Sequence, residues 1–171
     1  HREENVDTPA NLQDLLNTLQ ALVETYDMPV IVSTHPRTRQ RLEALGLDGL
    51  DSRIQFLKPF GFFDYIKLQM EAFCILSDSG TITEEASLLG LTAVTIRNAH
   101  ERPEGMDQGT LIMSGLKSER VLDAVRIVTS QDQAGAIRRV VPDYEGGLVS
   151  QKVLRIVLSY VDFINRTIWS K

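Results

Sequence analysis

Residues 72–90 read AFCILSDSGTITEEASLLG and combine a strand, a turn and a helix in one run. The apolar residues 72–76 predict a buried strand, the polar stretch 77–81 predicts a tight turn, and Ile82 begins a helix that ends before Gly90. In parallel sheets, ligands bind where strands end, and the first N–H groups of a following helix suit an anion. We therefore expect either a phosphate site or an ordinary connecting turn here.

The same alternation of strand and helix extends along the chain. Short apolar, mostly β-branched runs predict strands at 30–33, 54–57, 72–76, 92–96 and 111–113. Amphipathic patterns predict helices at 9–26, 37–45, 61–71, 82–89, 118–129 and 148–169, with Ser118 as the N-cap of the helix at 118–129 and a loop at 97–109. This order is typical of an α/β fold in which a parallel sheet has helices on both faces, and the run 30–33 is expected to be buried on both faces. The 171 residues suit a single domain, or one domain with a tail.

Composition excludes several classes of protein. The chain has 18 Lys and Arg against 23 Asp and Glu, a net charge of -5, which argues against a sequence-independent nucleic-acid binder. No apolar run reaches the ~18 residues of a membrane helix. One cysteine, Cys74, and three scattered histidines exclude an intramolecular disulfide and a zinc cluster, and no metal or cofactor is expected. A single cysteine suits a reducing compartment, so we expect a cytoplasmic protein.

Two neighbouring glutamates follow the turn and have different expected roles. The order Thr81-Ile82-Thr83-Glu84 fits a capping box, in which Glu84 reaches back to the Thr81 N–H. Glu85 lies on the apolar stripe of the helix instead, where a carboxylate is costly unless it has a partner. At the start of a helix it can accept hydrogen bonds from a ribose beside a phosphate. A buried ion pair, or a place at the solvent edge, is the alternative.

The charged stretch 97–107 is a second candidate, because long charged loops after strands are often functional. Arg102 is suited to clamp a phosphate, with Glu101 or Glu104 orienting its guanidinium. A solvated surface loop is the alternative, and charge alone favours it.

Further candidates are weaker when taken singly. The segment 1–5 (HREEN) supplies a His and an Arg that suit a diphosphate, although a polar terminus is often frayed. His35 follows a strand, where a structural role is the usual one. The aromatic residues Phe62, Phe63 and Tyr65 are suited to stack on a base, but such residues are more often part of a core.

Three segments, in the same order and with matching separations, resemble the non-hydrolysing UDP-N-acetylglucosamine 2-epimerase family: HREEN at 1–5, SDSG with EEA at 77–86, and ERPEG at 101–105. The resemblance covers essentially the whole chain, but only the C-terminal half of such an enzyme. It implies a Rossmann-like domain, one of two that face each other across a cleft in a GT-B-type fold. Separately, an apolar stripe along the final helix, in 148–171, suits packing on the N-terminal domain, and packing on the sheet of its own domain is the alternative.

The resemblance assigns site residues by position. It implies that Ser79 and Gly80 bind the diphosphate, that Glu85 binds the ribose hydroxyls and that Tyr65 lies near uracil. It places one catalytic residue in this segment, His1, which contacts phosphate together with Arg102. The remaining substrate contacts that it implies are Arg2, His35, Thr81 and Glu104.

The reaction that the resemblance implies inverts C2 of a UDP-N-acetylhexosamine. A base removes the C2 proton, UDP leaves to give a glycal, and UDP adds back after reprotonation on the other face. The principal acid and base carboxylates belong to the N-terminal domain, so this chain alone is expected to bind UDP weakly and to lack activity. The full-length enzyme is expected to be a homodimer.

Some positions depart from the family pattern. Glu3 and Thr81 stand where the family usually has Arg and Gly, and residues 33–36 read STHP. The stretch 98–107 is more similar to the branch that acts on modified sugars for capsule and O-antigen synthesis. A donor-binding domain of a GT-B glycosyltransferase and a non-catalytic nucleotide-sugar module are the alternative functions, and a flavodoxin-like domain is a third.

Overall fold

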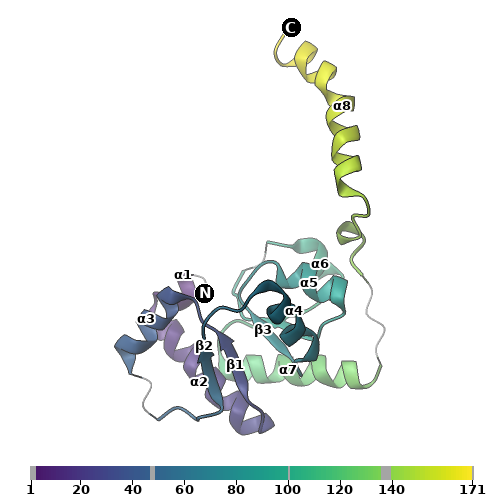
Figure 1. The fold of residues 1–171 in the computed structure, drawn as a ribbon. Helices are drawn as coiled ribbons and strands as arrows, with labels where there is room; N and C mark the ends of the chain where they lie inside the picture. The colour runs from purple at the N-terminus through teal and green to yellow at the C-terminus, as the bar shows by residue number, and fades with distance from the viewer. Residues whose placement is uncertain (1–2, 47–48, 100, 136–139, 171) are drawn as a thin grey trace. The chain divides into compact units, whose positions relative to one another are not determined.

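The structure is a computed structural model that describes residues 3–46, 49–99, 101–135 and 140–170. The chain divides into two compact units, His1–Val141 and Pro142–Lys171. The first unit contains all the strands that the structure describes, and the second contains a long helix (Figure 1).

The described strands are β1 (Val30–Ser33), β2 (Ile54–Leu57), β3 (Ile75–Ser77), β4 (Ala93–Thr95) and β5 (Ile112–Met113). The helices of the first unit are α1 (Glu3–Val6), α2 (Pro9–Tyr26), α3 (Pro36–Leu45), α4 (Phe62–Glu71), α5 (Ile82–Leu89), α6 (Pro103–Asp107) and α7 (Ser118–Gln133). The second unit contains a 3-10 turn, η1 (Pro142–Tyr144), and α8 (Val149–Thr167). All the predicted strands and helices are present, with ends shifted by a few residues.

Every strand pair in the described structure is parallel, as predicted, but the strands form two sheets. β1 pairs with β2, with Val30 opposite Ile54. β4 lies between β3 and β5, with Ala93 opposite Ile75 and Val94 opposite Ile112.

Strand β4 is covered on both faces, which confirms the predicted layering for the three-stranded sheet. Val94 is completely buried in a cluster that includes Leu22 of α2 and Val121 of α7. Its neighbour Ala93 points to the opposite face and packs with Ile82 of α5. Adjacent residues of a strand face opposite sides, so helices cover both faces here.

Strand β1 does not fit the prediction that both its faces are buried. Val30 and Val32 pack in the cluster that contains Val23 of α2. Ile31, on the opposite face, is 47% exposed. A β-branched run is typical of a strand, but its composition does not specify how many layers cover it. Within the first unit, this face of β1 therefore has incomplete cover.

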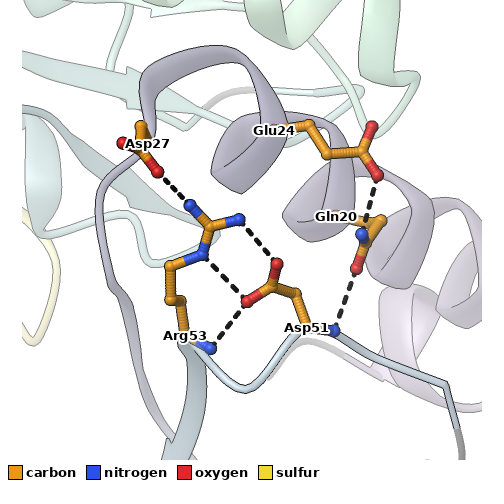
Figure 2. A network of polar contacts seen from close by, with 5 residues as sticks. All are labelled: Gln20, Glu24, Asp27, Asp51 and Arg53. Carbon is orange, nitrogen blue, oxygen red and sulfur yellow. Dashed lines mark hydrogen bonds and ion pairs between the residues drawn. The ribbon is translucent and has the colours of Figure 1, made fainter.

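The end of α2 is tied to the start of β2 by a polar network (Figure 2). Asp27 closes the helix in the left-handed conformation, with φ of 52°, and pairs with Arg53. Both carboxylate oxygens of Asp51 also bind Arg53, at 2.6 and 2.9 Å. Gln20 accepts a hydrogen bond from the Asp51 backbone N–H at 3.2 Å and donates one to Glu24 at 2.7 Å.

Two local predictions are corrected by the structure. The stretch 97–109, expected to be a loop, contains the short helix α6, because Pro103 takes the first helical position. Helix α7 has Lys117 rather than Ser118 at its N-cap, and Ser118 is already helical. No helix among the described residues combines the length and the apolar character that crossing a membrane requires.

Helix α8, taken by itself, is strongly amphipathic. Apolar side chains recur at helical spacing at Val153, Val157 and Tyr160. No side chain of α8 is buried. This helix therefore presents an apolar surface rather than a core of its own.

Candidate functional site

The turn from β3 into α5 is shaped by hydroxyl groups. The Ser77 hydroxyl accepts a hydrogen bond from the Ser79 N–H at 3.1 Å, and the Ser79 hydroxyl accepts one from the Thr81 N–H at 3.4 Å. The Ser79 and Thr81 hydroxyls are themselves 3.0 Å apart. Within the described structure, the Gly80 N–H has no acceptor. Of the N–H groups of Ser79, Gly80 and Thr81, that of Gly80 is thus the one left for an external acceptor, within the described structure.

Arg102 lies against this turn. A Cβ atom added to Gly80 would be 3.6 Å from Nη1 of Arg102 and 3.7 Å from Nη2. The Arg102 Nε donates to Glu84 at 2.7 Å, and Nη1 donates to the Glu101 carbonyl oxygen at 3.4 Å. The structure therefore brings two of the predicted segments, the turn and the charged stretch, into one place.

The expected capping box at Glu84 is wrong. Thr81 adopts a helical conformation, with φ of -66° and ψ of -16°, and no side chain caps α5. Glu84 instead accepts from Arg102, which is 18 residues further along the chain. A charged partner forms a stronger hydrogen bond than a neutral backbone N–H.

A second arginine lies beneath the same region. Arg97 follows β4, is only 7% exposed and pairs with Glu101 at 3.0 Å. Its Nε is buried and has no acceptor within the described structure. Together with Ser79, Gly80 and Arg102 it lines a small surface depression, which is completed by Thr83, Thr95, Ala99, Glu101 and Met106.

Glu85 is partly buried, as its place on the apolar stripe predicted, and it has a neutral partner. Gln69 of α4 donates a hydrogen bond to Oε2 of Glu85 at 2.6 Å. Tyr65, one helical turn before Gln69, is half-buried, and the pKa of its hydroxyl is raised by burial, by Glu85 and by Asp78. The predicted ribose and uracil residues, Glu85 and Tyr65, are therefore close enough to interact electrostatically.

Helix α1, at residues 3–6, contacts the same turn. Asn5 of α1 is 2% exposed and donates to the Asp78 carboxylate at 3.3 Å, across 73 residues of sequence. His1 and Arg2, which the resemblance places on phosphate, lie outside the described residues. Asn5 shows that the two segments converge, as the resemblance implies.

The other predicted site residues have more local surroundings. His35 is the N-cap of α3 and accepts from the Arg37 N–H through Nδ1 at 3.3 Å. Glu104 lies in the first turn of α6. Phe62 and Phe63, which are aromatic residues of a kind more often found in a core, are 72% and 84% exposed and contact each other edge to face.

Sequence reasoning assigned no role to three residues of this region, Asn5, Gln69 and Arg97, although Asn5 and Arg97 lie in the candidate segments 1–5 and 97–107. Gln69 and Tyr65 are four residues apart on α4, so they share a face, and this spacing was the one available signal. The partner of Asn5, Asp78, lies 73 residues further along the chain, and nothing local in the sequence indicates it. Arg97 pairs with Glu101 inside the charged stretch itself, four residues away, but its burial has no local signal.

The parallel strands, the helices on both faces of β4 and the turn at a strand's carboxyl end define a Rossmann-like α/β domain of the GT-B type. Residues 1–158 match the model of the UDP-N-acetylglucosamine 2-epimerase family. The chain belongs to this family.

Solved structures and curated relatives agree with this assignment. A UDP-N-acetylglucosamine 2-epimerase from Rickettsia bellii is 62% identical, with a TM-score of 0.88 over 96% of this chain and 45% of its own. The Methanocaldococcus jannaschii enzyme in complex with UDP-GlcNAc and UDP is 31% identical, with a TM-score of 0.80 over 93% of this chain and 43% of its own. The curated UDP-N-acetylglucosamine 2-epimerase of that organism is 37% identical over 134 residues, 77% of this chain and 37% of its own. The chain thus spans less than half the length of these relatives.

Proposed function

We propose that this chain is the UDP-binding half of a UDP-N-acetylhexosamine 2-epimerase. The observation that supports this most directly is the placement of Arg102 against Gly80, with the partly buried Glu85 one helical turn beyond. This arrangement offers donors for a diphosphate and an acceptor for a ribose within one site. The solved relative in complex with UDP-GlcNAc and UDP supports the same ligand class.

The diphosphate would bind at the turn. Backbone N–H groups at the start of a helix attract anions because they have no acceptor within the helix and because the helix dipole is positive there. A Cβ added to Gly80 would lie 3.6 Å from the Arg102 guanidinium, so the turn and the guanidinium are close enough for one phosphate to contact both. Glu84 orients Arg102 by accepting from Nε, and the guanidinium lies next to Gly80, with Nη1 also donating to the Glu101 carbonyl oxygen.

The nucleoside would extend from the turn toward α4. Only one oxygen of Glu85 accepts a hydrogen bond from the described residues, so the second is available to ribose hydroxyls. Tyr65, in the electrostatic neighbourhood of Glu85, would contact uracil. His1, Arg2, Thr81, His35 and Glu104 remain proposed substrate contacts, with His1 the proposed catalytic residue.

The proposed reaction requires a second half. Removal of the C2 proton, loss of UDP to form a glycal, and re-addition of UDP on the other face all need acid and base carboxylates. We place these in the part of the enzyme that lies outside this chain, since the chain spans 45% of the Rickettsia bellii relative. This chain by itself is therefore expected to bind UDP without turning over a sugar.

A titration tests the binding claim. Isothermal titration calorimetry with UDP, ADP and inorganic pyrophosphate should show preference for UDP, and Glu85→Gln should lower UDP affinity while leaving pyrophosphate affinity unchanged. A glutamine cannot accept from a ribose diol with two charged oxygens, but it leaves the turn intact. Equal affinity for UDP and pyrophosphate would refute a nucleoside site at Glu85.

A chimera tests the activity. This chain replaces the matching part of the Rickettsia bellii relative, and epimerisation is followed by exchange of the C2 proton in D2O. We expect turnover by the chimera and none by the chain alone. A chimera that binds UDP-N-acetylglucosamine but does not exchange the proton would favour the donor-binding domain of a glycosyltransferase, or a non-catalytic module. Turnover by the isolated chain would refute the proposal that the acid and base carboxylates lie outside this chain.

Helix α8 has a proposed place in the complete enzyme. Its apolar face, with no buried side chain of its own, suits packing against the N-terminal half. Trp169 at its end is exposed, so the isolated chain should show the fluorescence of a solvated indole. A blue-shifted emission that is typical of a buried indole would argue against this role.

Three finer features are also proposed: a cytoplasmic location, a homodimer in the full-length enzyme, and a role in capsule or O-antigen precursor synthesis. The lone Cys74 is a free thiol, which suits a reducing compartment. Light scattering of the chimera tests the dimer. Assay of the chimera with 6-deoxy UDP-N-acetylhexosamines alongside UDP-N-acetylglucosamine tests whether the enzyme acts on the modified sugars of capsule and O-antigen synthesis.

A further inference from the structure

We propose that Gln69 is a positioning residue that holds the Glu85 carboxylate in the orientation needed to bind the ribose hydroxyls. This inference rests on the proposed function, because it assigns a task to the neighbour of the proposed ribose-binding residue. It goes beyond that function by making nucleoside selectivity depend on a residue of α4 that need not touch the ligand.

The contact itself is specific. Gln69 is 4% exposed and lies near the end of α4, and its Nε2 donates to Oε2 of Glu85 on α5 at 2.6 Å. A carboxylate can only accept, so the amide must present its NH₂ group to Glu85, and the orientation of the amide is fixed. One carboxylate oxygen is thereby held, and the other is left for an external donor.

A buried amide at this position has a cost that an apolar residue would avoid. Oε1 of Gln69 is buried and receives no hydrogen bond from the described residues. An acceptor in this state costs about as much as a lost hydrogen bond. A methionine would fill a similar volume without that cost, because its side chain has no polar group that needs a hydrogen bond. Residues that break such local rules tend to occur at functional sites, which favours a role toward Glu85 over a role in folding.

The neighbouring Tyr65 places the contact at the nucleoside end of the site. Tyr65 and Gln69 are four residues apart and share one face of α4. Burial and the nearby charges of Glu85 and Asp78 raise the pKa of Tyr65, and the hydrogen bond from Gln69 brings the Glu85 carboxylate to α4. Loss of the Gln69 hydrogen bond would therefore free Glu85 to rotate away from its place beside Tyr65.

The test uses the whole chain and two ligands that differ only in the ribose. UDP and 2′,3′-dideoxyuridine diphosphate are titrated calorimetrically into the wild-type chain, Gln69→Met and the control Gln55→Met, which changes an exposed residue of β2. We expect Gln69→Met to bind UDP about tenfold more weakly, the size of effect that one hydrogen bond to a charged group supports. Binding of the dideoxy ligand should be unchanged in all three proteins.

Two readouts separate positioning from a structural role. Gln69→Met should unfold close to the wild-type temperature, because removal of an unsatisfied buried acceptor offsets the loss of the donor to the partly buried Glu85. In the Glu85→Gln background, Gln69→Met should cause no further loss of UDP affinity, because the group that it positions is gone.

The outcomes are distinguishable. If the wild-type chain discriminates between the two ligands and Gln69→Met discriminates equally well, the positioning role is refuted and the proposed function stands. An equal loss for both ligands would likewise refute it, by pointing to a general disruption of the site. If the wild-type chain binds UDP no better than the dideoxy ligand, the ribose site at Glu85 fails, and the role of Gln69 fails with it.

Discussion

Replacing Gly80 with alanine adds one methyl group between the proposed diphosphate site and Arg102. The added Cβ would lie 3.6 Å from the guanidinium, an ordinary van der Waals contact, and Gly80 has no positive φ that a side chain would strain. Folding should therefore tolerate the change, with a free energy of unfolding within about 1 kcal/mol of the wild type. A phosphate oxygen that must reach both the Gly80 N–H and Arg102 would be displaced.

The loss of one hydrogen bond to a charged group corresponds to about 1.5–3 kcal/mol, which is about a tenfold to hundredfold loss of UDP affinity. Calorimetric titration gives the affinity, and thermal unfolding gives the stability. Gly90→Ala is the matched control: Gly90 has φ of +65° at the end of α5, with open space around it. It should destabilise the fold by about 1 kcal/mol and leave UDP binding unchanged. UDP affinity that survives in Gly80→Ala would refute the placement of the diphosphate.

Three further predictions concern the fold. Gly115→Ala should destabilise the chain about as much as Gly90→Ala in thermal unfolding, because φ is positive at both positions, +71° and +65°, and the exposed Asn98 side chain, whose Oδ1 would lie 2.7 Å from the new Cβ, can rotate away; a much larger loss would contradict this. Hydrogen bonds from Arg53 hold the pKa of Asp51 at about 2, below its ordinary 3.8, so its stabilisation is present above that ordinary value and is lost as the pH falls through about 2. The free energy of unfolding, measured with urea, should accordingly depend less on pH in this range for Asp51→Asn than for the wild type. The same pH dependence in both proteins would refute the stabilising role of the Asp51 carboxylate. Burial raises the pKa of Cys74 to about 12, so iodoacetamide should label it only as the chain unfolds, and rapid labelling of the native protein would contradict that.

The helices and strands were predictable wherever a local signal marks both the pattern and its ends. Helix α2 begins at Pro9 and stops at Asp27, ahead of Pro29, and helix α5 stops at Gly90. In each case, apolar periodicity and a residue of special backbone geometry indicate the same boundary. How many layers cover a strand has no comparable signal, and for this reason the exposure of Ile31 was not predicted.

The site was predictable only in part, for the same physical reason. The turn and Glu85 follow from helical spacing around residues 77–86. The partner of Glu84 does not, because Arg102 approaches from another segment and outcompetes the local backbone N–H. Gln69 was missed because no sequence pattern marks a buried amide whose partner, the Glu85 carboxylate, lies on another helix.

The central claim is that UDP binds with its diphosphate at the turn and its ribose on Glu85, and the amide spectrum of the chain tests it most directly. In a ¹⁵N-labelled sample titrated with UDP, we predict that the backbone signals of Ser79, Gly80 and Thr81 move together with the side-chain NH₂ signal of Gln69. The Gln69 signal should stay fixed when inorganic pyrophosphate replaces UDP. Saturating UDP that leaves the turn unchanged, or that shifts only signals elsewhere in the chain, would contradict the account.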